Sequence, residues 1–173
     1  ALADAVNRLC EQAEELVRDG VSILAISDRV GEGEVPMPSL LAVSSVHNHL
    51  LRCGLRTQAD LIVECGDAIT AHDFATLVGY SASGIYPYLA HDTIASLTER
   101  GVLALDAETG IANYNAAILS GIVSIMSKMG ISTMQGYHAA QIFEAVGLAS
   151  ELIDTHFTGT VSRIGGLSID DLQ

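Results

Sequence analysis

Acidic side chains follow two short apolar runs that are typical of buried strands. Asp28 comes soon after the run 21–26, and Glu64 and Asp67 close the second run and its turn. In α/β folds the functional residues gather at the carboxyl ends of the strands, so Asp28 and Glu64 could form a general acid/base pair. A structural role is the favoured interpretation. Asp28 would then pair with Arg29 or accept a loop amide, and Glu64 would bond a neighbouring turn.

The six histidines invite a metal hypothesis, but their spacing does not favour one. His47 and His49 form the only close pair, and on a helix two residues at i and i+2 point about 200° apart. A helix that binds a metal uses positions i and i+4. His72 and His91 are each followed by an aspartate and look like residues at helix N-termini. The pattern predicts histidines that bond turns and caps.

The nucleophilic side chains are isolated in the sequence. Cys10, Cys53 and Cys65 are far apart and odd in number, which argues against a disulfide framework or a CxxC metal site and indicates buried cytosolic thiols. No GxSxG motif occurs. The only lysine, Lys128, falls in a predicted last helical turn, where its charge complements the helix dipole, rather than in a buried Schiff-base site.

Glycine-rich loops of the kind that cradle a phosphate are missing from the sequence. Neither GxGxxG nor GxxxxGKS/T occurs. In the stretch 31–34, Glu32 and Glu34 would repel a phosphate. We therefore expect this chain to hold no flavin and no metal.

The composition predicts a single folded domain over residues 1–173. Hydrophobic residues make up 49% and charged residues 17%, which argues against disorder. The net charge of −13, with scattered arginines, argues against nucleic acid or an anionic membrane as a partner. The apolar stretch 40–46 is shorter than the roughly 18 residues of a membrane span. The acidic N-terminus is unlike a signal peptide.

The hydrophobic pattern alternates between strands and helices. Helical spacing predicts helices at 4–19, 39–52, 71–78, 89–100, 114–129, 139–146 and 150–157. Short apolar runs predict strands at 21–26, 61–64, 84–88 and 131–134. Loops are expected at 31–38 and 106–110, with a glycine-rich tail at 159–166. The alternation is typical of βαβ units, so we predict an α/β fold of about four parallel strands with flanking helices, as a half-barrel or an open sheet.

Eight short stretches also occur in a co-linear order that is familiar from one family. They are Ser27-Asp28-Arg29, the two stretches 40–43 and 46–50, Gly54-Leu55-Arg56-Thr57, Pro87-Tyr88-Leu89-Ala90, MSKMGIST at 126–133, AQIFEAVGL at 140–148, and Ser162-Arg163-Ile164-Gly165-Gly166. Together they resemble the large subunit of glutamate synthase over nearly the whole chain, from about residue 16 to residue 166.

The resemblance implies a place in the later part of that family's central domain, between a glutamine amidotransferase domain and an FMN-binding barrel. It implies an α/β domain with no cofactor of its own, whereas FMN and an iron–sulfur cluster belong to other parts of the parent enzyme. No catalytic, cofactor-binding or metal-binding residue of the family is carried onto this chain. The parent reaction would convert 2-oxoglutarate and glutamine to two glutamates, with electrons from NADPH or ferredoxin.

Three functions are compatible with these observations. The favoured one is a non-catalytic, cytoplasmic structural module whose partners are the amidotransferase and FMN domains of the same chain. The second is an independent small α/β enzyme that uses Asp28, Glu64 and Asp67. The third is a self-associating interaction module. The chain begins without Met and ends in a stretch, 168–173, that reads like the start of a helix, so we expect a fragment of a larger multidomain chain.

Overall fold

The computed structural model describes residues 1–31 and 33–172 and has a mixed α/β fold with parallel strands, as predicted. The elements are α1 (Leu2–Arg18), β1 (Ile23–Ser27), α2 (Ser39–Arg52), the 3-10 turn η1 (Arg56–Gln58), β2 (Asp60–Glu64), α3 (Ala71–Gly79), β3 (Gly84–Tyr86), α4 (Tyr88–Glu99), α5 (Ala107–Lys128), α6 (Met134–Tyr137), β4 (Glu144–Leu148), α7 (Ser150–His156) and β5 (Val161–Leu167).

The first three strands form one parallel sheet in the order β1-β2-β3. Each connection between neighbours contains a helix, α2 and then α3, as a parallel pair requires. The register places Ser27 opposite Glu64, and Glu64 opposite Tyr86. The side chains that follow these positions therefore meet at one edge of the sheet.

The two faces of this sheet differ in burial. Leu24, Leu61 and Val63 belong to one face and are buried. On the opposite face Ile23 is 63% exposed and Tyr86 is 44% exposed. Parallel sheets normally have both faces covered, so this chain leaves one face without its usual cover. We call this second face the open face; its apolar residues are Ile23, Ala25, Ile62 and Tyr86.

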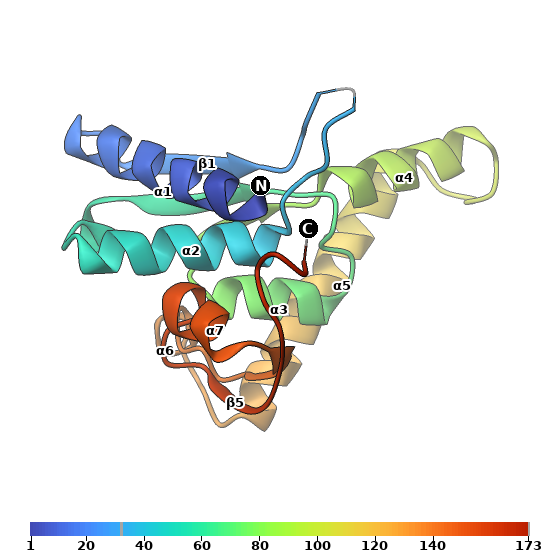
Figure 1. Cartoon of the computed structure of the whole chain (residues 1–173). Helices are drawn as coiled ribbons and strands as arrows, with labels where there is room; N and C mark the ends of the chain where they lie inside the picture. Colours follow the sequence, from blue (N-terminus) through green and yellow to red (C-terminus); the bar gives the residue numbers. More distant parts are fainter. Residues whose placement is uncertain (32, 173) are drawn as a thin grey trace.

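Helices α1 and α2 pack side by side over the N-terminal part of the sheet (Figure 1). The apolar residues of α1 recur at helical spacing and are buried: Val6, Cys10, Ala13 and Val17. Helix α2 is buried over most of its length, including the polar residues Ser44, Ser45, His47 and Asn48. Buried polar groups need hydrogen-bond partners, and those of α2 come from other elements.

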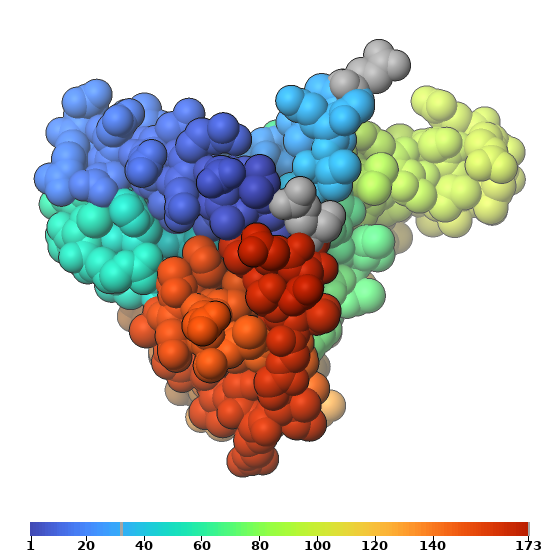
Figure 2. All heavy atoms as spheres, viewed as in Figure 1, coloured from blue at the N-terminus to red at the C-terminus, as the bar shows by residue number. Residues whose placement is uncertain are grey.

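Helices α4 and α5 form a hairpin whose α4 arm and connecting loop project from the body of the molecule (Figure 2), whereas α5 packs against α3. None of the described residues of α4 is buried. Helix α5 packs against α3 at Gly121, where an added methyl group would overlap the Cβ of Ala71. The outer side of α5 exposes Leu119 and Val123, which are 58% and 56% exposed.

Among the helices within residues 1–31 and 33–172, α5 alone is long and apolar enough to cross a membrane, judged by its length and composition. Helix α5 has 22 residues, and only 22% of its most apolar 18-residue stretch is buried in the fold. The prediction of no membrane partner rested on the shorter stretch 40–46. That prediction therefore stays untested.

The C-terminal part differs from the predicted secondary structure. The predicted strand 131–134 is a connection that leads into α6, the predicted helix 139–146 gives way to β4, and the glycine-rich tail contains β5. Ala139 and Gln141 have positive φ angles of 59° and 51°, which no α-helix accommodates. Strands β4 and β5 form a second, two-stranded parallel sheet. The described residues therefore form five parallel strands, close to the four predicted, and these are divided between two sheets.

Two smaller differences concern helix ends. Helix α5 begins at Ala107 because the Asp106 side chain accepts a hydrogen bond from the Thr109 amide at 2.8 Å, so the predicted loop 106–110 is mostly helix. At the C-terminus, residues 169–172 form turns, with the Ser168 amide bonded to Asp171 at 2.8 Å. Gln173, and Glu32 of the proposed phosphate-repelling loop, lie outside the described residues.

Polar side chains on α2 dock the C-terminal part of the chain. Ser44 and Asn48 donate hydrogen bonds to the backbone carbonyl of His156 at 2.5 and 3.0 Å. Arg52 donates to the carbonyl of Thr155 at 3.1 Å. These three residues recur every four positions, so they satisfy the last carbonyls of α7 along one face of α2.

Candidate functional site

Both carboxylate oxygens of Glu64 accept hydrogen bonds from neighbouring side chains. Ser27 donates to Oε2 at 2.7 Å, and Arg29 donates to Oε1 at 2.9 Å. These two bonds hold the pKa of Glu64 below its ordinary value, with Ser27 as the larger cause. A general base needs a pKa near the working pH, so the lowered pKa makes Glu64 poorly suited to proton transfer.

Asp28 and Asp67 accept hydrogen bonds from backbone amides at the same edge. Oδ2 of Asp28 accepts from Gly66 at 2.7 Å. Oδ2 of Asp67 accepts at 3.0 Å from Ser39, the first residue of α2. A carboxylate at this point satisfies an amide that no helix carbonyl reaches and complements the helix dipole. The loop-amide role expected for Asp28 is therefore confirmed, whereas Arg29 pairs with Glu64 instead.

The edge is closed by an aromatic ring. The guanidinium of Arg29 lies over the ring of Tyr88, 3.8 Å from its centre. Burial, and then the neighbouring Asp28 carboxylate, raises the pKa of Tyr88. The second oxygen of Asp28, Oδ1, is buried and has no hydrogen-bond partner among the described residues. These contacts connect β1, β2 and α4, so their role is to hold the three elements together.

At the opposite edge of the sheet, Arg56 organises a buried polar network. Its Nε donates to Nδ1 of His47 at 3.0 Å, and its terminal nitrogens donate to Ser81 and to the carbonyl of Ala59. Ser81 is buried at a positive φ of 87°, a conformation that costs energy and that these bonds hold in place. The network and His138 line a hollow of about 550 Å³.

His47 is neutral in this network. Burial, and then the charge of Arg56, lowers its pKa to about 4. Since guanidinium only donates, Nδ1 must accept and the ring proton resides on Nε2. The donors of Arg56 already bind protein groups, so the hollow offers no free cationic fork for an anionic ligand.

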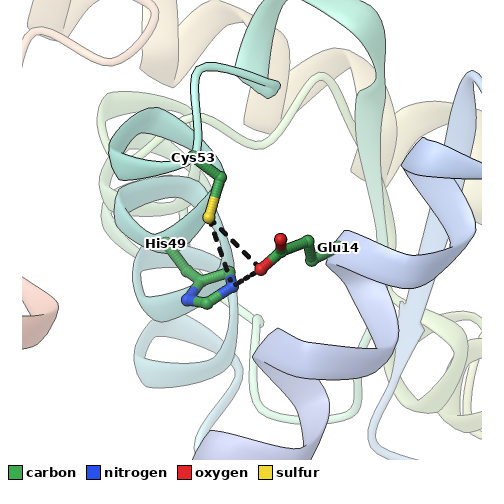
Figure 3. Close-up of side chains that lie close together, drawn as sticks. All are labelled: Glu14, His49 and Cys53. Atoms are coloured by element: carbon green, nitrogen blue, oxygen red, sulfur yellow. Dashed lines mark hydrogen bonds and ion pairs between the residues drawn. The ribbon is translucent and has the colours of Figure 1, made fainter.

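A third constellation joins α1 to α2 through Glu14, His49 and Cys53 (Figure 3). Oε2 of Glu14 lies 2.7 Å from Nε2 of His49 and 3.2 Å from Sγ of Cys53. Sγ lies 3.7 Å from the same Nε2. The other oxygen of Glu14 binds Arg18 at 2.7 Å. Within the described residues, this is the one group of three or more potential metal ligands.

The surroundings of this cluster favour the ionised form of Glu14 and the protonated thiol of Cys53. Hydrogen bonds from Arg18 first, and then from His49 and Cys53, lower the pKa of Glu14 to about 2. Burial first, and then the bond to Glu14, raises the pKa of Cys53. A Cys–His–Glu catalytic triad is excluded by geometry, because one nitrogen, Nε2, faces both partners, whereas a triad uses the two ring nitrogens separately.

This cluster is missing from the sequence-based candidates. The predictions of buried thiols hold for Cys10 and Cys65 but not for Cys53, which is half-buried. His49 and Cys53 stand at i and i+4, the spacing that a metal-binding helix uses, and this signal was available in the sequence. Glu14 became a candidate only through the packing of α1 on α2.

The residues at hand do not fit the cofactors that the resemblance implies for the parent. An iron–sulfur cluster requires several thiolates together, and among the described residues Cys53 has no second cysteine in its cluster. At the strand-end edge, acidic groups occupy the positions at which a flavin phosphate would bind in many α/β folds.

Comparison with known proteins identifies relatives over almost the whole chain. It is 47% identical over 162 residues to the glutamate synthase large chain (NADPH) of Bacillus subtilis, covering 93% of this chain and 11% of that protein. It is 43% identical to the ferredoxin-dependent glutamate synthase 2 of Synechocystis, covering 99% of this chain and 12% of the relative. It is 42% identical to the glutamate synthase (NADH) of Saccharomyces cerevisiae, covering 98% and 8% respectively.

The chain thus spans about a tenth of the length of these curated relatives. Residues 1–149 match the family described as the glutamate synthase central domain. The predicted resemblance is confirmed. The chain belongs to the glutamate synthase central domain family.

Proposed function

We propose that this chain is a non-catalytic structural segment of a glutamate synthase that links the glutamine amidotransferase and FMN domains of its parent. The parent would convert 2-oxoglutarate and glutamine to two glutamates in the cytoplasm. In this role the segment contributes no reacting group. It offers surfaces against which the neighbouring domains pack.

The open face of the sheet is the observation that carries the proposal. Ile23 and Tyr86 are 63% and 44% exposed on a parallel sheet, although such sheets are normally covered on both faces. Apolar side chains that stay in water lose the free energy of burial, about 25 cal/mol per Å². A neighbouring domain that covered this face would recover it.

The projecting hairpin offers a second apolar surface of the same kind. Leu89 on α4 and Val102 and Leu105 in the loop after it are 49%, 61% and 37% exposed. Extended patches of this kind commonly mark interaction sites. Helix α4 and its loop stand away from the body, so they could reach a domain that the sheet does not contact.

The strand-end carboxylates support the non-catalytic part of the proposal. Glu64, Asp28 and Asp67 each accept hydrogen bonds that hold the fold together. An independent α/β enzyme would need at least one of them free to exchange a proton. The buried, unpartnered Oδ1 of Asp28 is the one feature that favours this second candidate function.

The identities give no preference for an electron donor. The names of the three relatives specify NADPH, ferredoxin and NADH, and their identities to this chain lie between 42% and 47%. A segment that contacted the electron donor would be expected to have a distinctly higher sequence identity to the relatives that use that donor. We therefore assign donor choice to other parts of the parent.

The test uses the full-length parent enzyme with charge introduced on the open face, as Ile23→Asp. We expect each half reaction, glutamine hydrolysis and reductive glutamate formation from ammonia, to persist while coupling between them falls. The matched control is Leu16→Asp, an exposed apolar position on α1. Equal coupling in both variants would refute the linking role.

A second variant separates the linking function from the enzyme function. Glu64→Gln keeps the shape of the side chain and removes its charge. If the chain is structural, the parent should keep its activity at low temperature and lose thermal stability. Loss of a half reaction in a parent of unchanged stability would instead establish a catalytic role for the strand-end edge.

A further inference from the structure

Glu14, His49 and Cys53 present a carboxylate oxygen, an imidazole nitrogen and a sulfur to one point between α1 and α2 (Figure 3). His49 and Cys53 are four residues apart, so α2 directs both side chains to the same side. Glu14 reaches them from α1, across the interface that buries Cys10 and Ala13. We propose that this cluster is a zinc-binding site that clasps α1 to α2.

The residue types match the coordination chemistry of zinc. Zn²⁺ binds cysteine sulfur, histidine nitrogen and carboxylate oxygen, whereas Ca²⁺ and Mg²⁺ select oxygen ligands alone. One ligand of each kind is present here. The mixed set therefore favours zinc, or Co²⁺ as its laboratory substitute, over the hard divalent cations.

The separations of the three ligand atoms suit a tetrahedral ion. Zinc bonds of about 2.0–2.3 Å place neighbouring ligand atoms about 3.3–3.6 Å apart in a tetrahedron. The observed separations are 2.7 Å for O–N, 3.2 Å for O–S and 3.7 Å for N–S. The largest adjustment, at the Glu14–His49 edge, is about 0.6 Å, which rotation of the side chains supplies.

Arg18 orients the carboxylate for this role. It binds Oε1 of Glu14 at 2.7 Å and leaves Oε2 directed at His49 and Cys53. A hydrogen-bonded carboxylate of this kind is the usual support of a metal ligand. The side chains of His49 and Glu14 are 23% and 25% exposed, so a water molecule has access to the fourth coordination position.

Binding replaces the hydrogen bonds within the cluster. The thiol of Cys53 donates to Oε2, and Nε2 of His49 lies 2.7 Å from the same oxygen, which as a carboxylate oxygen accepts the proton that Nε2 carries. Zinc takes the place of both protons. The thiol proton leaves to solvent and the imidazole keeps its proton on Nδ1, so Nε2 can coordinate the metal.

A bound ion would cross-link two helices that otherwise meet through side-chain packing. Because the ion binds only the arranged cluster, it stabilises the folded chain by mass action. The N-terminal helix would then stay docked on α2. The inference goes beyond the linking function and does not depend on it.

The experiment measures zinc affinity of the 173-residue chain by competition with a chromophoric chelator. Glu14→Gln, His49→Gln and Cys53→Ser should each weaken binding at least about tenfold, the effect of losing even a supporting residue of a metal site. The matched controls are Glu15→Gln, His72→Gln and Cys65→Ser, and these should bind zinc like the unmodified chain. Circular dichroism establishes that each variant is folded.

Cobalt provides a second readout that needs no variant. Co²⁺ added to the unmodified chain should give a thiolate-to-cobalt charge-transfer band in the near ultraviolet, at one equivalent, and Cys53→Ser should abolish it. Zinc should also raise the melting temperature of the unmodified chain and leave that of Cys53→Ser unchanged. Absence of the cobalt band at saturating metal, or equal zinc affinity in the ligand and control variants, would overturn the proposal.

Discussion

The side-chain amide of Asn48 donates a hydrogen bond to the backbone carbonyl of His156, 108 positions later in the chain, at 3.0 Å. The same nitrogen donates to the carbonyl of Ser44 at 2.9 Å, and Asn48 is only 4% exposed. This contact lies where the end of α7 meets the middle of α2. It therefore joins the C-terminal part of the fold to the N-terminal part.

We expect Asn48→Ala to lower the free energy of unfolding by about 0.5–1.5 kcal/mol, because it removes one of the two side-chain hydrogen bonds that α2 donates to the His156 carbonyl. Urea unfolding of the isolated chain measures this. Asn113→Ala, an exposed position on α5, should change stability little. Equal stability of the two variants would mean that the docking contact contributes nothing.

Gly121→Ala should destabilise the chain although alanine is the better helix former. The added methyl group would overlap the Cβ of Ala71, which belongs to α3 and cannot rotate away. Overpacking of this kind costs about 1–3 kcal/mol, more than the gain in helix propensity of about 1 kcal/mol. Adding Ala71→Gly to Gly121→Ala should restore part of the loss in a thermal melt, and failure of this rescue would contradict the packing argument.

Stability should fall as the pH drops from 6.5 towards 4. The pKa of His47 is lowered from 6.5 to about 4, so between these values the unfolded chain binds the proton and the folded chain does not. The contribution is fully present above pH 6.5, and at about 1.4 kcal/mol per pH unit it is of the order of 3 kcal/mol. Burial lowers the pKa of His138 and His156 too, with the same sign.

His47→Gln should reduce this slope, since glutamine can still accept from Arg56 but does not titrate in this range. Denaturant unfolding at several pH values provides the measurement. His72→Gln, at an exposed position, is the control. If His47→Gln and the unmodified chain show the same pH dependence, the protonation of His47 does not contribute to the loss of stability at low pH.

Asp28→Ala should lower stability by roughly 1.5–3 kcal/mol, because the Gly66 amide loses its charged acceptor. Asp92→Ala, on the exposed side of α4, is expected to melt like the unmodified chain. Thermal melts distinguish the two. An unchanged melting temperature of Asp28→Ala combined with loss of activity in the parent would favour the enzyme hypothesis over the structural one.

The isolated chain should self-associate, and association should strengthen with salt. The open face and the edge strands of both sheets lack a cover within the described residues, whereas the net charge of −13 opposes contact. Salt weakens that repulsion, as the Debye length falls to ~3 Å at 1 M. Light scattering at low and high salt tests this, with Ile23→Asp as the variant expected to associate less. A monomeric mass under both conditions would contradict it.

The sequence was sufficient where local signals determine structure. The helix at 39–52 begins and ends as predicted, and the runs that became β1 and β2 carry enough β-branched residues, bounded by turns, to be recognised. The motifs around 126–133 and 140–148 also identified the family without any coordinates. For the helix and the two strands the information lies within a few consecutive residues, and for the family it lies in the order of several short motifs along the chain.

Tertiary structure decided what depends on partners that are distant in the chain. Glu144–Leu148 became a strand because Val161–Leu167 pairs with it, and its helix-like spacing could not reveal that partner. His49 and Cys53 carried a recognisable spacing, but Glu14 joined them only because α1 packs on α2. The burial of Asn48 and the exposure of the open face also depend on how elements that are distant in the sequence pack together. Periodicity records which side of an element is apolar, and only packing determines what covers it.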